Sequence, residues 1–179
     1  MISLRPLKEK DAPLMLEWMH DVEIQKSFQK NMMNMKLQNA IDFCKTSEIP
    51  KVLQSGYNLH FAIVDEEDEY LGTISLKAID MENRTAEYAI STRRKVHGKG
   101  IAKHSTILLL EKAFDEYELH KVYLNVLTDN EAAIHLYEKC GFKLEGEARE
   151  CLFKDGKYTN LKWYGILKSE FNQIRLKLS

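Results

Sequence analysis

The feature that most constrains the fold is a glycine-bearing loop between an expected strand and an expected helix. Residues 93–100 read Arg-Arg-Lys-Val-His-Gly-Lys-Gly, and Ile101 to Tyr117 follows with apolar residues at helical spacing. The first amide groups of a helix have no intrahelical acceptor, and glycines let an anion approach them closely. The sequence therefore predicts an anion site at this loop. The alternative is a tight turn with solvated lysines.

The charge and spacing of this loop narrow the kind of anion site. Arg93, Arg94, Lys95 and Lys99 are expected to add mobile positive charge around it. A P-loop needs four residues between its first glycine and Gly-Lys-Ser/Thr, and that spacing is absent here. A dinucleotide-binding fingerprint needs a third glycine where Lys103 stands. Both of these phosphate-binding patterns are excluded.

The pattern along the chain predicts an α+β fold with about seven strands and about four helices. Three strand-like runs with short turns between them precede the loop, which is typical of an antiparallel meander. Lys-Asp-Gly-Lys at 154–157 predicts a hairpin, and Gly141 predicts the end of a helix. The expected strands are 1–5, 59–64, 70–78, 84–92, 121–127, 142–153 and 158–167, and the expected helices begin at Asp11, Lys36, Ile101 and Asp129.

Composition excludes several classes of protein. A chain of 179 residues fits a single domain, 1–179, and a formal net charge of −1 gives no general attraction to nucleic acid or anionic membrane. The N-terminal residues lack the apolar core of a signal peptide, and the longest apolar run, Ile107 to Leu110, is far too short to span a membrane. Cys44, Cys140 and Cys151 are widely spaced, so we expect reduced thiols in apolar settings, no metal site and a cytoplasmic protein.

Two motifs resemble the GNAT acetyltransferase superfamily. The diphosphate loop of that family reads Gln/Arg-x-x-Gly-x-Gly/Ala, which Gly100 and Ala102 fit, whereas His97 replaces the expected Gln or Arg. The second family pattern is Asn-x-x-Ala-x-x-Leu-Tyr-Glu-Lys-x-Gly-Phe. This chain keeps Asn130, Ala133, Leu136, Tyr137, Glu138, Lys139, Gly141 and Phe142. The order of elements also resembles the family over about residues 1 to 168.

The resemblance implies a GNAT-like, largely antiparallel central sheet and acetyl-CoA as co-substrate, with no metal. The main chain at Ile90, Ser91 and Thr92 would bind the pantetheine amides and polarise the thioester carbonyl. Asn130 would bond the pantetheine arm, unless it only caps its helix. The residues that would hold the diphosphate are His97, Gly98, Lys99, Gly100, Ile101 and Ala102.

Catalysis is expected to use two residues, because the acceptor amine must lose a proton and the departing thiolate must gain one. Glu87 is the candidate base, since a glutamate inside a strand must face a cleft or a partner. Its alternative role is an ion pair with Arg84 or Arg93. Tyr137 is the candidate acid, seven residues after Asn130 on the same helix face, and its alternative role is a half-buried core aromatic.

Further details are similar to the RimJ/RimL-like branch of the superfamily. These are Leu-Glu-Trp at 16–18 and the closing hairpin, and they place Trp18, His20, Asp21 and Phe28 on the acceptor wall, with a core role as the alternative for Trp18. The chain is thus interpreted as an N-acetyltransferase that acts on a primary amine of a small molecule or a protein N-terminus. A catalytically silent acyl-CoA-binding module and a different acyl-CoA donor are the alternatives, and homodimerisation is left open.

Overall fold

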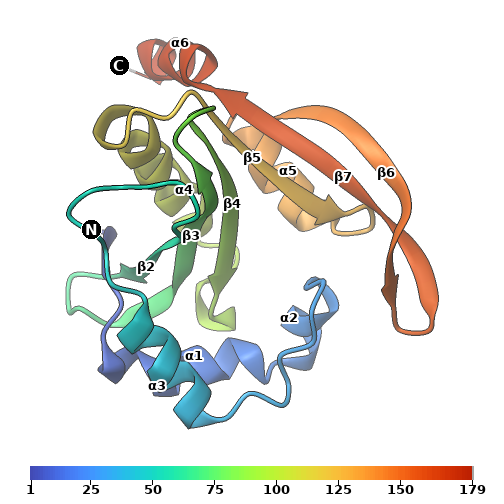
Figure 1. The fold of residues 1–179 in the computed structure, drawn as a ribbon. Coiled ribbons are helices and arrows are strands. Elements are labelled where there is room, and N and C mark those ends of the chain that lie inside the picture. Colours follow the sequence, from blue (N-terminus) through green and yellow to red (C-terminus); the bar gives the residue numbers. More distant parts are fainter. Residues whose placement is uncertain (179) are drawn as a thin grey trace.

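The computed structural model describes residues 1–178, and a single seven-stranded sheet organises them (Figure 1). The strand order is β1-β2-β3-β4-β5-β7-β6, and every neighbouring pair is antiparallel except β4 and β5. The predicted α+β fold with a largely antiparallel sheet is therefore confirmed. The strands are β1 (Ser3–Pro6), β2 (Leu59–Val64), β3 (Tyr70–Asp80), β4 (Thr85–Thr92), β5 (Lys121–Leu127), β6 (Lys143–Lys154) and β7 (Lys157–Leu167).

The number of helices is larger than the sequence predicts. The described residues form α1 (Ala12–Met19), α2 (Val22–Lys26), α3 (Leu37–Thr46), α4 (Ile101–Glu111), α5 (Glu131–Lys139) and α6 (Lys168–Leu178). Helix α2 was missed because its five residues are too few to show a period, and α6 because the resemblance ends near residue 168. Helix α4 passes into a π-helical turn over Lys112–Glu116 instead of continuing unchanged to Tyr117.

One face of the sheet packs against α4, α5 and α6. Because side chains alternate along a strand, every second residue of β2, β3 and β4 points to this face, including Phe61, Ile74 and Tyr88. These residues meet Leu109 of α4 and Phe171 of α6, which are both fully buried. In Figure 1, α4 and α5 lie together behind the strands.

The opposite face is covered only in part. Ala62 and Val64 of β2 and Tyr70 of β3 pack with Met15 and Trp18 of α1 in a second core. Figure 1 shows α1, α2 and α3 gathered at one end of the sheet. The rest of this face, toward β5 and β7, has no helix over it in the described part of the chain, and we call it the open face.

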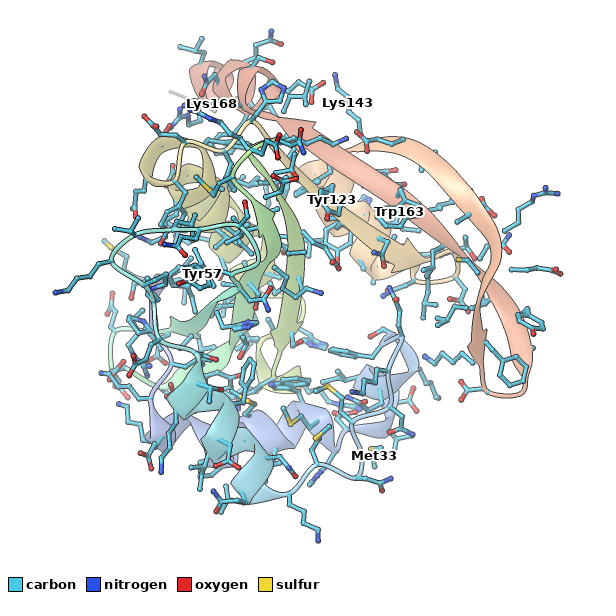
Figure 2. All side chains as sticks on the ribbon, in the orientation of Figure 1. Met33, Tyr57, Tyr123, Lys143, Trp163 and Lys168 are labelled. Carbon is cyan, nitrogen blue, oxygen red and sulfur yellow. The ribbon has the colours of Figure 1, made fainter. Side chains whose placement is uncertain are left out.

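Aromatic side chains line the open face. Tyr123 of β5 and Trp163 of β7 point out from it, and their ring centroids are 6.1 Å apart (Figure 2). The indole of Trp163 is 36% exposed, which is unusual for tryptophan and shows how little covers this part of the sheet.

The predicted turn chemistry is confirmed at two places. Asp155 and Gly156 have φ of 50° and 79°, the left-handed pair of a two-residue hairpin loop, and they join the long strands β6 and β7. Gly141 has φ of 95° and follows α5, where it ends the helix. The β6–β7 hairpin projects beyond the end of β5 in Figure 1.

Two local predictions are wrong. Asp11 does not cap α1 with its side chain, because its carboxylate instead accepts from the Lys8 amide and from the Arg5 guanidinium, each at 2.8 Å. Cys44 and Cys140 are buried as expected, but Cys151 is exposed on β6. The three thiols are free.

Among the described helices, none is both long enough and apolar enough to cross a membrane.

Candidate active site

The sheet opens between its two parallel strands. β4 and β5 pair only at Thr85–Lys121, Ala86–Val122 and Glu87–Tyr123. Beyond Glu87, β4 keeps its pairing with β3 as far as Thr92 but has no ladder partner on the other edge. The main chain at Ile90, Ser91 and Thr92 therefore lies along an unpaired strand edge, as the resemblance implies. Backbone groups on such an edge can bond a ligand instead of a strand.

Gly72 fixes how closely this end of β4 approaches β3. A Cβ atom on Gly72 would stand 2.4 Å from the carbonyl oxygen of Ser91 and 2.9 Å from the Cα of Thr92. Only glycine lets the two strands come this close. The position of the unpaired edge of β4 thus depends on a glycine in the neighbouring strand.

The glycine-bearing loop presents a group of free main-chain donors. Gly98 and Gly100 both have φ of 74°, and no atom lies within 4 Å of the position that a Cβ would take on either. Gly100 is the N-cap residue of α4 and no side chain caps this helix. Within the described residues, no backbone carbonyl accepts from the amides of Gly98, Gly100, Ile101, Ala102 and Lys103. Several convergent N–H groups at a helix N-terminus fit a diphosphate.

The three basic residues at the start of the loop are not mobile, which corrects the sequence prediction. Arg93 is 6% exposed, and its guanidinium donates to both carboxylate oxygens of Glu17, at 2.6 and 2.9 Å, and to Glu69 at 2.5 Å. Lys95 donates to the same oxygen of Glu69 at 2.5 Å. These contacts fix the start of the loop to α1 and to the β2–β3 turn, so the cations cannot move to a ligand freely.

Arg94 joins the loop to the start of α2. It donates through Nε to Asp21 at 2.6 Å and through a second nitrogen to the other carboxylate oxygen. Asp21 also accepts from the amides of Glu23 and Ile24, which makes it the N-cap of α2. The hydrogen bonds from Arg94 lower the pKa of Asp21 to about 2, with smaller contributions from the two amides. Asp21, a predicted acceptor-wall residue, is therefore occupied by structural contacts.

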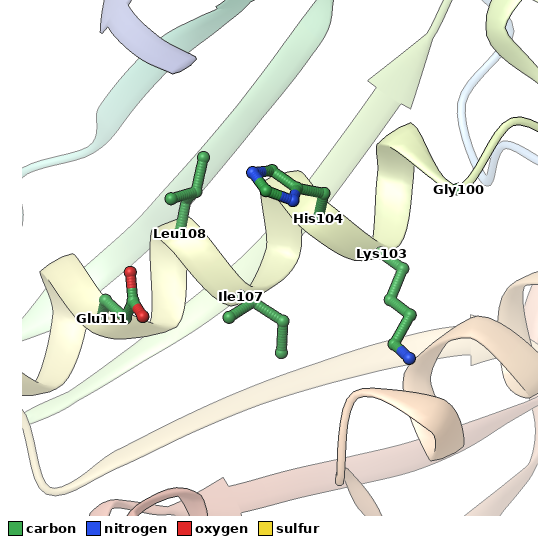
Figure 3. A pocket seen from close by; sticks show the side chains of 6 residues that line it. All are labelled: Gly100, Lys103, His104, Ile107, Leu108 and Glu111. Atoms are coloured by element: carbon green, nitrogen blue, oxygen red, sulfur yellow. The ribbon is translucent and has the colours of Figure 1, made fainter. Parts of the chain in front are cut away.

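The remaining positive charge lies near the helix start. Lys99 and Lys103 are exposed, and neither makes an ion pair within the described residues. Figure 3 shows Lys103 and His104 projecting from the first turn of α4, next to Gly100. They belong to a hollow of about 390 Å³ that is lined by Gly100, Lys103, His104, Ile107, Leu108 and Glu111. His97 is exposed at the loop, and its side chain makes no hydrogen bond with the described residues, so its replacement of Gln or Arg leaves the main-chain donors unchanged.

Tyr137 lies against the point where β4 and β5 part. Its ring meets the ring of Tyr88 edge-to-face at 5.6 Å, and Tyr88 is the first residue of β4 beyond the last pair with β5. Tyr137 is 9% exposed, and burial raises the pKa of its phenol, with a smaller effect from the Cys140 thiol. The phenol therefore stays protonated at neutral pH, as a general acid must.

The hydroxyl of Tyr137 reaches accessible space. It forms no hydrogen bond with the described residues, yet no buried side-chain oxygen or nitrogen among them lacks a partner. Its oxygen must therefore be accessible, although most of the ring is buried. An apolar setting with one accessible donor suits a group that protonates a leaving atom.

Glu87 faces the other side of the sheet. It neighbours Tyr88 in β4, so its side chain points to the open face, beside Tyr123. It forms an ion pair with Lys77 at 2.9 Å, not with Arg84 or Arg93. Burial raises the pKa of Tyr123, and the charge of Glu87 raises it further. Glu87 and Tyr137 thus lie on opposite faces, at the level where the strands separate.

The other predicted residues have structural partners. The side chain of Asn130 caps α5 by accepting from the Ala133 amide at 3.2 Å. Trp18 is 4% exposed and donates to the Tyr70 hydroxyl at 3.0 Å, which favours the core alternative. Phe28 stacks on Trp18 at 5.4 Å, and His20 bonds the Met35 carbonyl at 2.7 Å.

Two side chains, Gln29 and Lys154, form hydrogen bonds that the sequence did not predict. These bonds join α2 and the residues after it to β5 and to the β6–β7 hairpin. Gln29 donates to Asn125 of β5, which links this segment to the strand past the separation. Lys154, next to the hairpin turn, donates to the carbonyls of Lys26 and Phe28, each at 2.5 Å. No local pattern identifies these pairs, since they join residues 96 to 128 positions apart.

Comparisons with known proteins agree with this geometry. Residues 2–143 match the family described as acetyltransferase (GNAT) domain. Spermidine N(1)-acetyltransferase of Vibrio cholerae is 35% identical over 66% of this chain and 73% of its own length. The Escherichia coli K12 protein of the same name is 29% identical over 89% of this chain and 82% of its own length. A putative ribosomal N-acetyltransferase of Bacillus subtilis is 36% identical over 56% of this chain and 55% of its own.

A solved structure is also similar over nearly the whole chain. It is spermidine N-acetyltransferase from Vibrio cholerae in complex with CoA and spermine, with a TM-score of 0.82, 26% identity, and coverage of 96% of this chain and 98% of that one. These comparisons support the superfamily and the coenzyme. The narrower resemblance to the RimJ/RimL-like branch stays a prediction.

Proposed function

Because the chain belongs to the GNAT acetyltransferase family and is an acetyl-CoA-dependent N-acetyltransferase, we propose that it acetylates a primary amine by direct attack within a ternary complex. Residues 1–179 act as one catalytic domain in this proposal. The observation that carries it is the meeting of three features at one opening: the unpaired edge of β4, the free amides of Gly98 and Gly100–Ala102, and the accessible hydroxyl of Tyr137.

The coenzyme would lie across these three features. Amides of the loop and the first turn of α4 fit the diphosphate, with Lys99 and Lys103 nearby. The edge of β4 at Ile90, Ser91 and Thr92 would take the pantetheine amides and the thioester oxygen. The coenzyme supplies the activated acetyl group, and the protein orients it.

The transfer step needs two proton movements. As the amine nitrogen bonds to the acetyl carbon, the carbon–sulfur bond breaks and Tyr137 gives its proton to the departing sulfur. The reference pKa is about 10 for a phenol and about 8.5 for a thiol. The difference of about 1.5 units makes the proton transfer to the thiolate cost about 2 kcal/mol. Burial raises the pKa of Tyr137, which opposes the transfer, but the same low-polarity setting also disfavours a free thiolate, so the two effects offset one another.

The amine must also be deprotonated. A lysine-like amine has a reference pKa of about 10.4, so its neutral form costs about 4.6 kcal/mol at pH 7. Glu87 is the base in this proposal, acting directly or through water from the open face, where its carboxylate pairs with Lys77. Its exposed fraction of 26% lets water or substrate reach it.

The acceptor proposed first is a polyamine such as spermidine, because relatives named for that substrate match most of the chain. One observation favours a second candidate, the N-terminus of a peptide. Between Asp21 and Lys30, both acidic residues are already paired, Asp21 with Arg94 and Glu23 with Lys26, whereas Lys30 is exposed and makes no ion pair with the described residues. A polycation would find no free carboxylate on this segment.

One assay separates these candidates. Thiol release from acetyl-CoA is measured with spermidine, spermine, peptides with free N-termini, an amino-sugar nucleotide and an aminoglycoside, and repeated with succinyl-CoA and propionyl-CoA. Turnover on a polyamine supports the first acceptor, and turnover only on peptides supports the second. Coenzyme binding without turnover on any amine would instead support a silent acyl-CoA-binding module and contradict the proposal.

A further inference from the structure

Two buried aromatic rings pack against the ring of the candidate acid. Tyr137, Tyr88 and Phe142 are 9%, 3% and 3% exposed. Their centroids lie 5.6 Å apart for Tyr88–Tyr137, 5.6 Å for Tyr88–Phe142 and 6.0 Å for Tyr137–Phe142. Each ring touches the other two at a steep angle, which is a favourable arrangement for aromatic pairs. The orientation of the Tyr137 ring therefore depends directly on Tyr88.

The hydroxyl of Tyr88 forms a hydrogen bond to helix α4. It lies 2.7 Å from the hydroxyl oxygen of Thr106, and Thr106 donates to the Ala102 carbonyl at 2.7 Å. Because a threonine hydroxyl has one proton, which goes to Ala102, Tyr88 must be the donor to Thr106. A directed chain thus runs from Tyr88 through Thr106 to Ala102. Burial raises the pKa of Tyr88 well above its usual value, so this proton stays in place.

The series of hydrogen bonds from Tyr88 through Thr106 ends at Ala102, in the first turn of α4. Ala102 belongs to the group of residues whose amides are free to bind the diphosphate. Tyr88 therefore contacts the Tyr137 ring directly and reaches the start of α4 through Thr106. The aromatic contacts alone would be satisfied by phenylalanine, so the hydroxyl serves the link and not the packing.

From this juxtaposition we infer that Tyr88 is a positioning residue, which sets the distance and angle between the diphosphate cradle and the Tyr137 phenol. The inference rests on the proposed role of Tyr137. A pantetheine arm bound along β4, as proposed, has a set separation between its diphosphate and its sulfur, so the protein must hold α4 and the phenol at a matching separation. A small misplacement of a catalytic group can reduce a rate by about a hundredfold.

The test uses Tyr88→Phe, which keeps the ring and removes only the link. We expect kcat to fall about tenfold while the Kd for acetyl-CoA, measured by calorimetry, changes less than about twofold. Thr106→Val should reproduce this split, and Thr106→Ser, which keeps the hydroxyl, should restore most of the rate. Tyr70→Phe is the matched control, since it removes another buried, bonded tyrosine hydroxyl and should lower the Tm without changing kcat.

A double-mutant cycle with Tyr137→Phe identifies the route of the effect. If Tyr88 acts through Tyr137, adding Tyr88→Phe to Tyr137→Phe should cost no further rate. A normal kcat in Tyr88→Phe would overturn the inference. So would a double variant whose kcat falls below that of Tyr137→Phe by the full factor seen for Tyr88→Phe alone. A normal kcat in Tyr137→Phe would instead overturn the acid role in the proposed function. If Tyr88→Phe does not fold, the two Thr106 variants decide between the same outcomes.

Discussion

The two sides of the sheet meet where β4 and β5 separate, and they are built in contrasting ways. On the side of α4 and α5, the groups available to a ligand are unpaired among the described residues: the amides of Gly98 and Gly100–Ala102 and the hydroxyl of Tyr137. On the open face and around α1 and α2, charged groups are paired with one another, as in Lys77–Glu87, Arg94–Asp21 and Arg93–Glu17.

This difference shows which half of the site is ready to bind. In the proposed site, the amide donors of the coenzyme half have no internal acceptor among the described residues to give up, so we expect this half to bind without rearrangement. The acceptor half must exchange one set of partners for another, so an amine competes there with ion pairs already formed. We expect substitutions on the coenzyme half to produce large and simple losses, and substitutions on the acceptor half to produce smaller changes that depend on pH.

The largest loss is expected from Tyr137→Phe. Removing the phenolic proton should lower kcat by about ten- to a thousandfold, the range of a general acid, while acetyl-CoA binding is retained. Steady-state thiol release and calorimetry measure the two quantities. Tyr158→Phe, an exposed tyrosine of the β6–β7 hairpin, is the control. Unchanged turnover would remove Tyr137 from the mechanism and erase the contrast between the two halves.

A second substitution tests the cradle. Gly100→Asp places a side chain at φ of 74° and puts negative charge among the free amides, so the Kd for acetyl-CoA should rise about tenfold or more. Gly156→Asp is the matched control, because Gly156 has a similar φ of 79° in the distant hairpin turn and should show the backbone strain without the loss of affinity. Equal coenzyme affinity in both variants would contradict the assignment of the loop.

On the acceptor half, Glu87→Gln should lower kcat/KM about tenfold at pH 7, through loss of the base. The deficit should shrink as the pH approaches the pKa of the amine, about 10.4, because the neutral amine then forms unaided. Lys77→Met keeps the carboxylate and removes its partner, so activity should persist. A pH-independent deficit, or the same loss in Lys77→Met, would show that the pair only supports the sheet.

The smallest expected effect is on the pH dependence of the Tm, and it comes from His60, which is close to the Lys77–Glu87 pair. Burial lowers the pKa of His60 to about 4, and the charge of Lys77 contributes. Since the unfolded pKa is about 6.5, the unfolded state binds more protons between pH 6.5 and 4. The stability present above pH 6.5 is therefore lost as the pH falls toward 4. His60→Gln should flatten the fall in Tm over this window. The exposed His120→Gln should not, and a slope unchanged in His60→Gln would refute the assignment.

The coenzyme half was largely predictable because it depends on local spacing. Gly98 and Gly100 stand immediately before a helical pattern, and the Asn130 to Phe142 motif places Tyr137 on its helix. The hairpin likewise follows from Asp155 and Gly156, whose backbone conformation few other residues adopt readily. Such signals are confined to a few neighbouring residues and can be read directly from the sequence.

The acceptor half was not predictable, because its contacts are distant in the chain. Arg93 appeared to be a mobile cation, yet it is buried against Glu17, 76 positions away. Helix α2 is too short to be stable on propensity alone, and it depends on Asp21, on Arg94 and on the hairpin residue Lys154. Only the folded chain brings these residues together.

The most direct test is a structure of the protein with coenzyme A bound. We predict that the diphosphate accepts from the amides of Gly98 and Gly100–Ala102, that the pantetheine arm lies along β4 at Ile90–Thr92, and that the sulfur lies within hydrogen-bonding distance of the Tyr137 hydroxyl. A diphosphate bound elsewhere, or a Tyr137 hydroxyl turned away from the sulfur, would contradict this prediction.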